Sequence, residues 1–334
     1  MEVNELTKKF KKSSIIISTD LETDDLLAIW MLSKIIPNKN IMFLVGEGDS
    51  YIKSKRMERY AKSLGFTNYS VVQGIGSKKL FKYDGHDIFK LDEIKEFKKD
   101  IEEGTDEGTD DIRLCVTLAS LKFFIKWNSP LIFSLKPPRE LIELWKMKNT
   151  IFKNCIMFGY MSFNLRCLMK EWSHENIIEF LNSFEECYFY ETYHAVGKNN
   201  IISGKDIDMK KLPKLVYDLM IYWNKSMLEN CQETCETYKD RKDKRGVSKF
   251  RRNSAVVKAI NDNNGEQFVN ADCGLIMSLL DQNVSYIKKS LKFDESGYSI
   301  FSEGGKINVI NVCDKKKFRE SQIELLKEML NFLL

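Results

Sequence analysis

The chain has 334 residues, of which 43% are hydrophobic and 30% are charged. This balance is that of a globular protein, and no apolar run approaches the roughly 20 residues of a membrane-spanning helix. The 52 basic residues nearly balance the 48 acidic ones, and a net charge of +4 argues against a polyanion such as nucleic acid as the general partner.

The organisation of the chain is expected to be simple. No linker rich in proline, glycine or serine divides it, so we expect a single domain over residues 1–334. Residues 1–10 are acidic and polar where a signal peptide would be basic and then apolar, and the eight cysteines are scattered. Both features predict a cytoplasmic protein with free thiols and no membrane association.

A buried strand, an acidic loop and a helix are predicted close to the amino terminus. Residues 15–17 are uninterrupted isoleucines, and apolar residues recur at helical intervals over residues 26–35. Asp20, Asp24 and Asp25 then lie at the carboxyl end of the strand, where ligands bind in open α/β sheets. Crowded carboxylates repel one another unless a cation neutralises them, and their oxygens favour Ca²⁺ or Mg²⁺. A second interpretation is that Thr23 or Asp24 merely caps the helix and that the acids complement its dipole.

The later elements alternate between strands and helices, which predicts an α/β fold. Strands are expected at residues 154–158 and 186–190, a hairpin at residues 298–301 and 307–312 with a Gly304-Gly305 turn, and a closing amphipathic helix at residues 318–334.

Two segments differ from this pattern. Residues 96–111 include a repeated Glu-Gly-Thr-Asp unit, which indicates an acidic surface insertion. Residues 237–253 are basic, with Tyr238 and Phe250 interspersed. They indicate either a solvated surface segment or a site for phosphate or nucleic acid, and the interspersed aspartates favour the first.

The acidic loop resembles a family motif. Residues 18–25 read STDLETDD, which is similar to the DTDPGxDD motif of the inosine-uridine-preferring nucleoside hydrolases. Three of the four aspartates match, and Ser18 replaces the first.

Weaker similarities to the same family follow in the expected order along the chain. Residues 42–47 resemble its second strand and Gly-Asn turn, with Glu47 in place of asparagine. Residues 131–142 resemble the LGPLTNLA segment and align its threonine with Arg139. Residues 161–164 resemble the end of AEFN and keep Asn164, while residues 269–275 resemble the HDPLA motif and keep Asp272.

The resemblance implies a fold, an activity and a cofactor. The fold would be an open, mostly parallel Rossmann-like sheet with helices on both faces. The activity would be calcium-dependent hydrolysis of the N-glycosidic bond of ribonucleosides, which releases free base and ribose in purine or pyrimidine salvage. The family is usually oligomeric, so a homo-oligomer is expected, and its mobile flap over the base pocket would correspond to residues 237–253.

The resemblance also implies roles for individual residues. Asp20 would be the general base and a calcium ligand. Asp25, Asp272 and the backbone carbonyl of Arg139 would complete the calcium ligands. The substrate-binding residues would be Asp24 on the ribose hydroxyls together with Asn164 and Glu47.

The departures from the family pattern leave the leaving-group acid unassigned. Ala271 stands where the family often has the histidine that protonates the base. The chain has three histidines, His86, His174 and His194, and His86 is the best substitute because it lies in a polar loop.

Three functions therefore compete. The first is a calcium-dependent N-ribohydrolase, and the second is a nonenzymatic relative that binds metal and a nucleoside or a protein partner. The third is a haloacid-dehalogenase-type phosphatase, which ranks last because Ser18 occupies the place of its nucleophilic aspartate.

Overall fold

The computed structural model describes residues 3–36, 39–47, 50–75, 110–160, 172–190, 201–269, 271–293 and 299–331. Within these ranges a nine-stranded sheet has the order β10-β9-β11-β6-β5-β4-β1-β2-β3, and β7 pairs separately with β8. The strands are β1 Ile15–Thr19, β2 Ile41–Val45, β3 Tyr69–Gln73, β4 Leu131–Ser134, β5 Ile156–Tyr160, β6 Glu186–Tyr190, β7 Ile201–Ser203, β8 Gln267–Val269, β9 Val284–Phe293, β10 Ser299–Glu303 and β11 Ile307–Val312.

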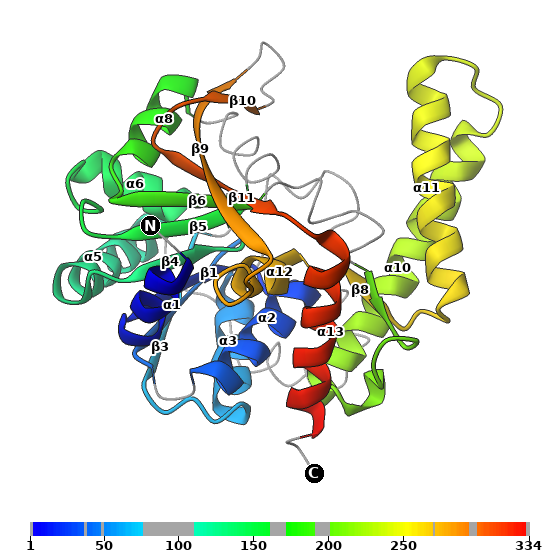
Figure 1. The fold of residues 1–334 in the computed structure, drawn as a ribbon, viewed down its shortest axis with the longest axis horizontal. Helices are drawn as coiled ribbons and strands as arrows, with labels where there is room; N and C mark the ends of the chain where they lie inside the picture. Colours follow the sequence, from blue (N-terminus) through cyan, green and yellow to red (C-terminus); the bar gives the residue numbers. More distant parts are fainter. Residues whose placement is uncertain are drawn as a thin grey trace.

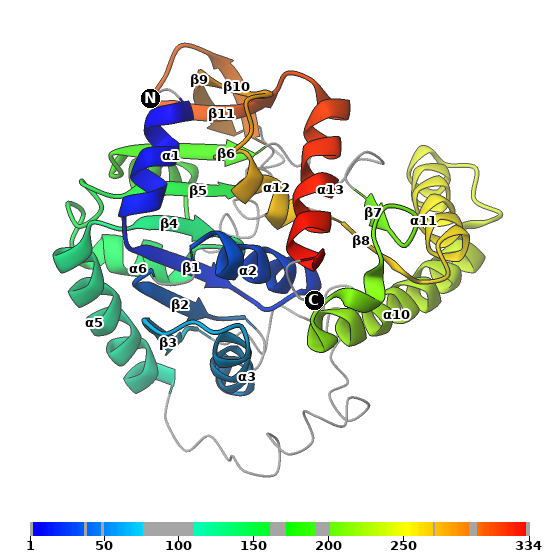
Figure 2. The same cartoon turned by 60° about the horizontal axis from the view of Figure 1, so that its bottom comes forward.

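The sheet is mostly parallel and is covered by helices on both faces (Figures 1 and 2). Strands β1 to β6 and β11 run parallel, while β9 and β10 are antiparallel to their neighbours. The expected α/β fold is therefore confirmed. The helices are α1 Val3–Lys12, α2 Thr23–Ile35, α3 Ser50–Ser63, α5 Asp110–Asn128, α6 Arg139–Met147, α8 His174–Asn182, η3 Met209–Lys211, α10 Lys214–Tyr238, α11 Lys244–Asp262, α12 Ala271–Met277 and α13 Lys315–Asn331.

Two apolar cores, one on each face, hold the helices to the sheet. Ile15 and Ile17 of β1 point into the core shared with α1, α2, α3, α10, α12 and α13, whereas Ile16 points into the core shared with α5, α6 and α8. Successive side chains of a strand point to opposite faces, so an uninterrupted apolar run is what a strand buried on both sides requires. This is why β1 was predictable.

The predicted hairpin between residues 298–301 and 307–312 is wrong. Both strands exist, but each pairs with β9, which lies between them. The turn at Gly304 and Gly305 therefore crosses β9 to reach its far side. A Cβ atom added at Gly305 would lie 2.3 Å from the carbonyl oxygen of Lys289, which explains why glycine is needed at this crossing.

The position of β1 in the sheet determines where a ligand site can form. The chain proceeds from β1 to β2 and β3 on one side, and then returns to β4 on the other side of β1. Such a reversal of strand order opens a crevice at the carboxyl ends of the strands. The acidic loop follows β1 directly and therefore lies at this point.

Helices α10 and α11 pack against each other and extend away from the sheet at the right of Figure 1. The basic segment of residues 237–253 forms the turn between them and the start of α11. No helix in the described ranges is long and apolar enough to cross a membrane. Most of the predicted acidic insertion, residues 96–109, lies outside the described residues, and α5 begins at Asp110.

Candidate metal centre

The acidic loop is organised around the carboxylate of Asp25, which is buried in the first turn of α2. One of its oxygens, Oδ2, accepts three hydrogen bonds. The donors are the hydroxyl of Thr19, the backbone N–H of Asp20 at 3.0 Å and the backbone N–H of Leu21 at 3.1 Å. Hydrogen bonds to an ionised carboxylate are stronger than those between neutral groups, so the strand end and the helix start are tied together.

This arrangement requires a left-handed backbone conformation at Leu21. Its φ is 59°, a value that costs a residue with a side chain of order 1 kcal/mol or more. The cost is offset because the Leu21 side chain is buried in the core and its N–H is bonded to both Thr19 Oγ1 and Asp25. The strained turn aims the loop backbone toward Asp25.

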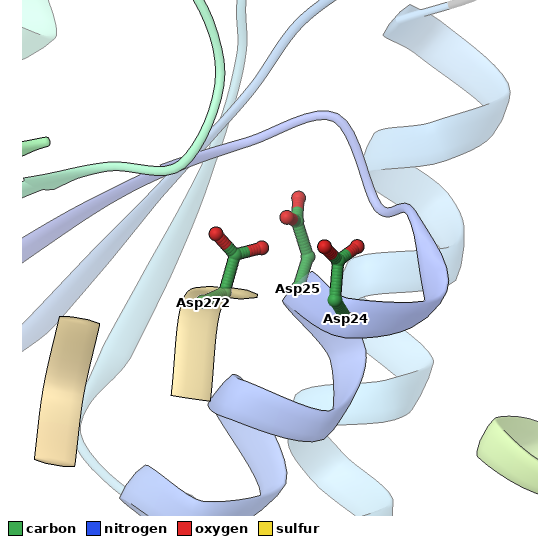
Figure 3. Close-up of side chains that lie close together, drawn as sticks. All are labelled: Asp24, Asp25 and Asp272. Carbon is green, nitrogen blue, oxygen red and sulfur yellow. The ribbon is translucent and has the colours of Figure 1, made fainter. Parts of the chain in front are cut away.

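Three carboxylates meet at this end of the sheet, and Figure 3 shows them converging from two helices. One oxygen each from Asp24, Asp25 and Asp272 lies within 4.8 Å of the others. Asp24 and Asp25 come from the first turn of α2, and Asp272 comes from the start of α12, which packs against α2. The structure thus brings together residues that are 247 positions apart in the sequence (272 − 25).

The prediction that Thr23 or Asp24 caps α2 is wrong. The helix begins at Thr23 with Glu22 as its N-cap, and the Glu22 side chain makes no capping hydrogen bond. Asp24 and Asp25 lie in the first turn, where they also complement the helix dipole. A dipole effect alone does not account for Asp272, which reaches the cluster from another helix.

The electrostatics of the cluster are those of a buried anionic site. Burial, with repulsion from Asp25 and Glu22, raises the pKa of Asp20 and the pKa of Asp24 well above the ordinary value. The ammonium of Lys53 acts in the opposite direction on the pKa of Asp20. Burial and the charge of Asp272 also raise the pKa of the neighbouring Cys273 thiol. Carboxylates in such surroundings are stabilised by a bound cation.

The donor set fits a hard divalent cation. Carboxylate oxygens are the ligands that Ca²⁺ and Mg²⁺ prefer, and no cysteine or histidine belongs to the cluster within the described residues. The hydroxyl of Ser18, one residue before the loop, is buried without a hydrogen-bond partner in the described part of the chain. This strand end therefore also contains a polar atom that the described protein groups leave unsatisfied.

Asp20, which the sequence predicts as base and ligand, lies beside the three-carboxylate cluster and not within it. Its backbone N–H binds Asp25, and its carboxyl group is close enough to Asp25 for the two charges to interact. Asp24, predicted to bind the ribose, occupies the cluster instead. The roles predicted for Asp20 and Asp24 stay predictions.

Glu47 and Arg139 form a buried ion pair near the same end of the sheet. Their Oε1 and Nε atoms are 2.8 Å apart, and both side chains are almost fully buried. Glu47 follows β2 with a left-handed φ of 65°, and Arg139 opens α6 after β4. The two strands flank β1, so this pair links the segments that follow β2 and β4. Sequence reasoning assigned both residues to the site but did not predict that they pair.

A second buried ion pair, Lys136–Glu140, was missed entirely. Its Nζ and Oε2 atoms are 2.6 Å apart, neither side chain is exposed, and the other oxygen of Glu140 accepts the N–H of Ile75 at 2.8 Å. A Cβ atom at Gly46 would lie 2.5 Å from Glu140, and one at Gly74 only 2.2 Å from it. Two features of the sequence could have indicated this pair. Lys136 and Glu140 are four residues apart, and the strand ends that pack against them carry the glycines Gly46 and Gly74.

Several predicted residues are not tested by this geometry. Asn164, His86 and His194 lie outside the described residues. His174 begins α8, with its ring 5.0 Å from that of Phe293. Tyr238 stacks under the guanidinium of Arg241 at 5.4 Å, at the tip of the α10–α11 hairpin.

Comparisons with known proteins agree with the geometry. No family model and no curated protein matches the sequence. A solved structure titled "Inosine-Guanosine Nucleoside Hydrolase (IG-NH)" matches with a TM-score of 0.55, over 95% of this chain and 98% of that chain, at 10% sequence identity. The chain has the nucleoside hydrolase fold. At this identity the similarity establishes the fold, and the carboxylate cluster provides separate evidence about the chemistry.

Proposed function

We propose that this protein is a calcium-dependent N-ribohydrolase, a single nucleoside hydrolase-like domain that releases free base and ribose from ribonucleosides. The observation that carries the proposal is the convergence of Asp24, Asp25 and Asp272 at the carboxyl end of β1. Cleaving an N-glycosidic bond develops positive charge on the sugar, so the reaction needs a positioned water, a base and an anchor for the sugar hydroxyls. An anionic, oxygen-rich cluster on this fold meets those needs.

The position of each residue suggests its role. Asp25 and Asp272 would hold the ion with carboxylate oxygens, and the backbone carbonyl of Arg139 would add a ligand. A bound Ca²⁺ would lower the pKa of a coordinated water and accept vicinal hydroxyls. Asp20 would accept the proton of the attacking water, because it lies next to Asp25 and its carboxyl is poised among like charges. Asp24 would bind the ribose hydroxyls, or the ion itself.

The polar shell around the sugar would differ from that of the family. Glu47 is ion-paired with Arg139, and its carboxylate would accept a hydrogen bond from a substrate hydroxyl. Asn164 would supply a second ribose contact. Ala271 stands where the family has the histidine that protonates the departing nucleobase. We propose His86 as the acid that takes over this role.

A second candidate function follows from the substituted positions. Because Ser18 stands in place of the first aspartate of the motif and Ala271 in place of the histidine, the protein would bind a metal and a nucleoside or protein partner without turnover. The two candidates differ in product formation and agree on metal binding.

The deciding experiment measures free base released from purine, pyrimidine and nicotinamide ribosides by chromatography, with calcium and with a chelator. Calcium binding is measured in parallel by isothermal titration calorimetry. We expect chelator-sensitive release, loss of both release and calcium binding in Asp25→Asn, and loss of release with retained calcium binding in Asp20→Asn.

Asp218→Asn is the matched control, because Asp218 is a surface carboxylate whose partner is the exposed Lys214. It should keep both properties. Calcium binding without release from any riboside favours the nonenzymatic relative, whereas a fully active Asp20→Asn protein contradicts the assigned base.

A further inference from the structure

A closed ring of contacts joins the first turn of α6 to the segments that follow β2 and β3. Arg139 and Glu140 are the first two residues of α6, and both are buried. Arg139 pairs with Glu47, and Oε1 of Glu140 accepts the backbone N–H of Ile75 at 2.8 Å. The ring is closed because the carbonyl oxygen of Ile75 accepts the backbone N–H of Glu47 at 2.9 Å. Neighbouring residues of α6 therefore hold both the side chain and the backbone of Glu47.

The carboxylate of Glu140 is held on both of its oxygens. While Oε1 binds the N–H of Ile75, Oε2 lies 2.6 Å from the ammonium of Lys136. The backbone of two strand ends packs against the same group, since a Cβ atom added at Gly46 or at Gly74 would collide with Oε1. Glycine at these two positions leaves room for the carboxylate. Lys136 thus fixes Glu140, and Glu140 fixes Ile75.

Stability alone does not explain a charged pair at this place. An apolar pair of similar volume is often as stable as a buried ion pair or more stable, because burial removes both charges from water. An apolar pair would supply no acceptor for the N–H of Ile75, and a buried N–H without an acceptor is costly. The hydrogen bond supports the turn at Glu47, whose φ of 65° is a left-handed conformation that its surroundings must maintain.

We propose that Glu140 is a positioning residue that acts on Glu47 through the backbone of Ile75, while Lys136 orients Glu140. The inference rests on the proposed function, in which the carboxylate of Glu47 binds a hydroxyl of the ribonucleoside. A hydrogen bond to a charged group changes affinity by roughly ten- to a hundredfold, and it is lost when the acceptor is displaced. Glu140 thus contributes to substrate affinity without touching the substrate.

Two double variants isolate the hydrogen bond to Ile75. Lys136→Met with Glu140→Gln removes both charges and keeps a side-chain acceptor, whereas Lys136→Met with Glu140→Leu removes both charges and the acceptor. Neither change leaves one partner of the pair buried and charged, so we expect both chains to fold. With calcium present, the KM for a cleaved riboside should be at least about tenfold higher in the Glu140→Leu chain than in the Glu140→Gln chain, at similar kcat.

The dependence on Glu47 separates positioning from a general loss of structure. The difference in KM between the two chains should disappear when both also carry Glu47→Ala, because the carboxylate that is positioned is then absent. A structural effect that spreads through the site would persist in that background. Equal KM values in the Glu140→Gln and Glu140→Leu chains, or a difference that persists with Glu47→Ala, overturns the proposal.

Amide hydrogen exchange, measured by NMR, tests the same contact without turnover. We expect the N–H of Glu47 to exchange at least about tenfold faster in the Glu140→Leu chain than in the Glu140→Gln chain, while the N–H of Ile17 in β1 exchanges alike in both. Equal exchange of the Glu47 N–H in the two chains overturns the proposal. If the unmodified chain releases no base but exchange at Glu47 depends on Glu140 as expected, the N-ribohydrolase is contradicted and the positioning of Glu47 is supported.

Discussion

The buried pair Lys136–Glu140 predicts a large loss of stability when one partner alone is changed. Neither side chain is exposed, and besides Glu140 the Lys136 ammonium donates to the Pro137 carbonyl oxygen, at 3.5 Å, in the described structure. Glu140→Gln keeps an acceptor for the N–H of Ile75 but leaves a buried, unpaired ammonium. Breaking such a pair costs about 3 to 5 kcal/mol in the free energy of unfolding, which urea denaturation measures.

A double variant and a surface pair make this prediction specific. Lys136→Met together with Glu140→Gln removes both charges, so we expect it to recover at least half of the loss. Asp218→Asn breaks the exposed pair with Lys214, which has the same four-residue spacing, and should cost less than about 1 kcal/mol. The reasoning is refuted if Glu140→Gln costs no more than Asp218→Asn, or if the double variant is as unstable as the single one.

Three further predictions concern the carboxylate loop and the β9 crossing. Folding raises the pKa values of Asp20 and Asp24, so their contribution to the free energy of unfolding of the metal-free chain is largest below about pH 4. This contribution falls as the pH rises through the raised pKa values. Denaturation at several pH values should show this decrease, and Asp24→Asn should make it smaller. Thr19→Val removes the hydroxyl donor to Asp25 and should cost about 1 to 3 kcal/mol in urea unfolding, a loss that Ser70→Ala on the exposed side of β3 should not reproduce. Gly305→Ala should lower the melting temperature by several degrees because its Cβ meets the β9 backbone, and an unchanged melting temperature would show that the crossing is looser than described.

The parts of the fold that the sequence predicted are those with a clear period. The isoleucine run of β1 and the helical spacing of α2 gave the strand, the loop and the position of Asp25 correctly. Strand β9 was missed because its sequence, VSYIKKSLKF, breaks the alternation at Lys288 and Lys289, and because only two of its ten residues are buried. Without β9, the Gly304-Gly305 pair had no other interpretation than a hairpin turn.

In the candidate site too, local patterns were predictable and contacts between distant segments were not. Asp272 was placed with Asp25 only through the resemblance, because local patterns carry no information on a contact between distant segments. The two buried ion pairs were not predicted, since charged residues are almost never fully buried unless paired, and a sequence does not reveal the pairing. Glu47 was predicted to bind substrate and Arg139 to bind the metal, but their pairing depends on the position of β2 and β4 on either side of β1.

The three hydrogen bonds on one oxygen of Asp25 have a consequence for how metal and substrate would depend on each other. With that oxygen saturated, Asp25 has only its other oxygen to offer, and if Asp24 and Asp272 each gave one oxygen as well, the three residues would supply three ligands. Calcium takes six to eight oxygens, so in the proposed complex about half of its coordination would fall to water and sugar hydroxyls. Each ligand would then raise the affinity for the other by the same factor, and calcium would be held most tightly when a nucleoside is present.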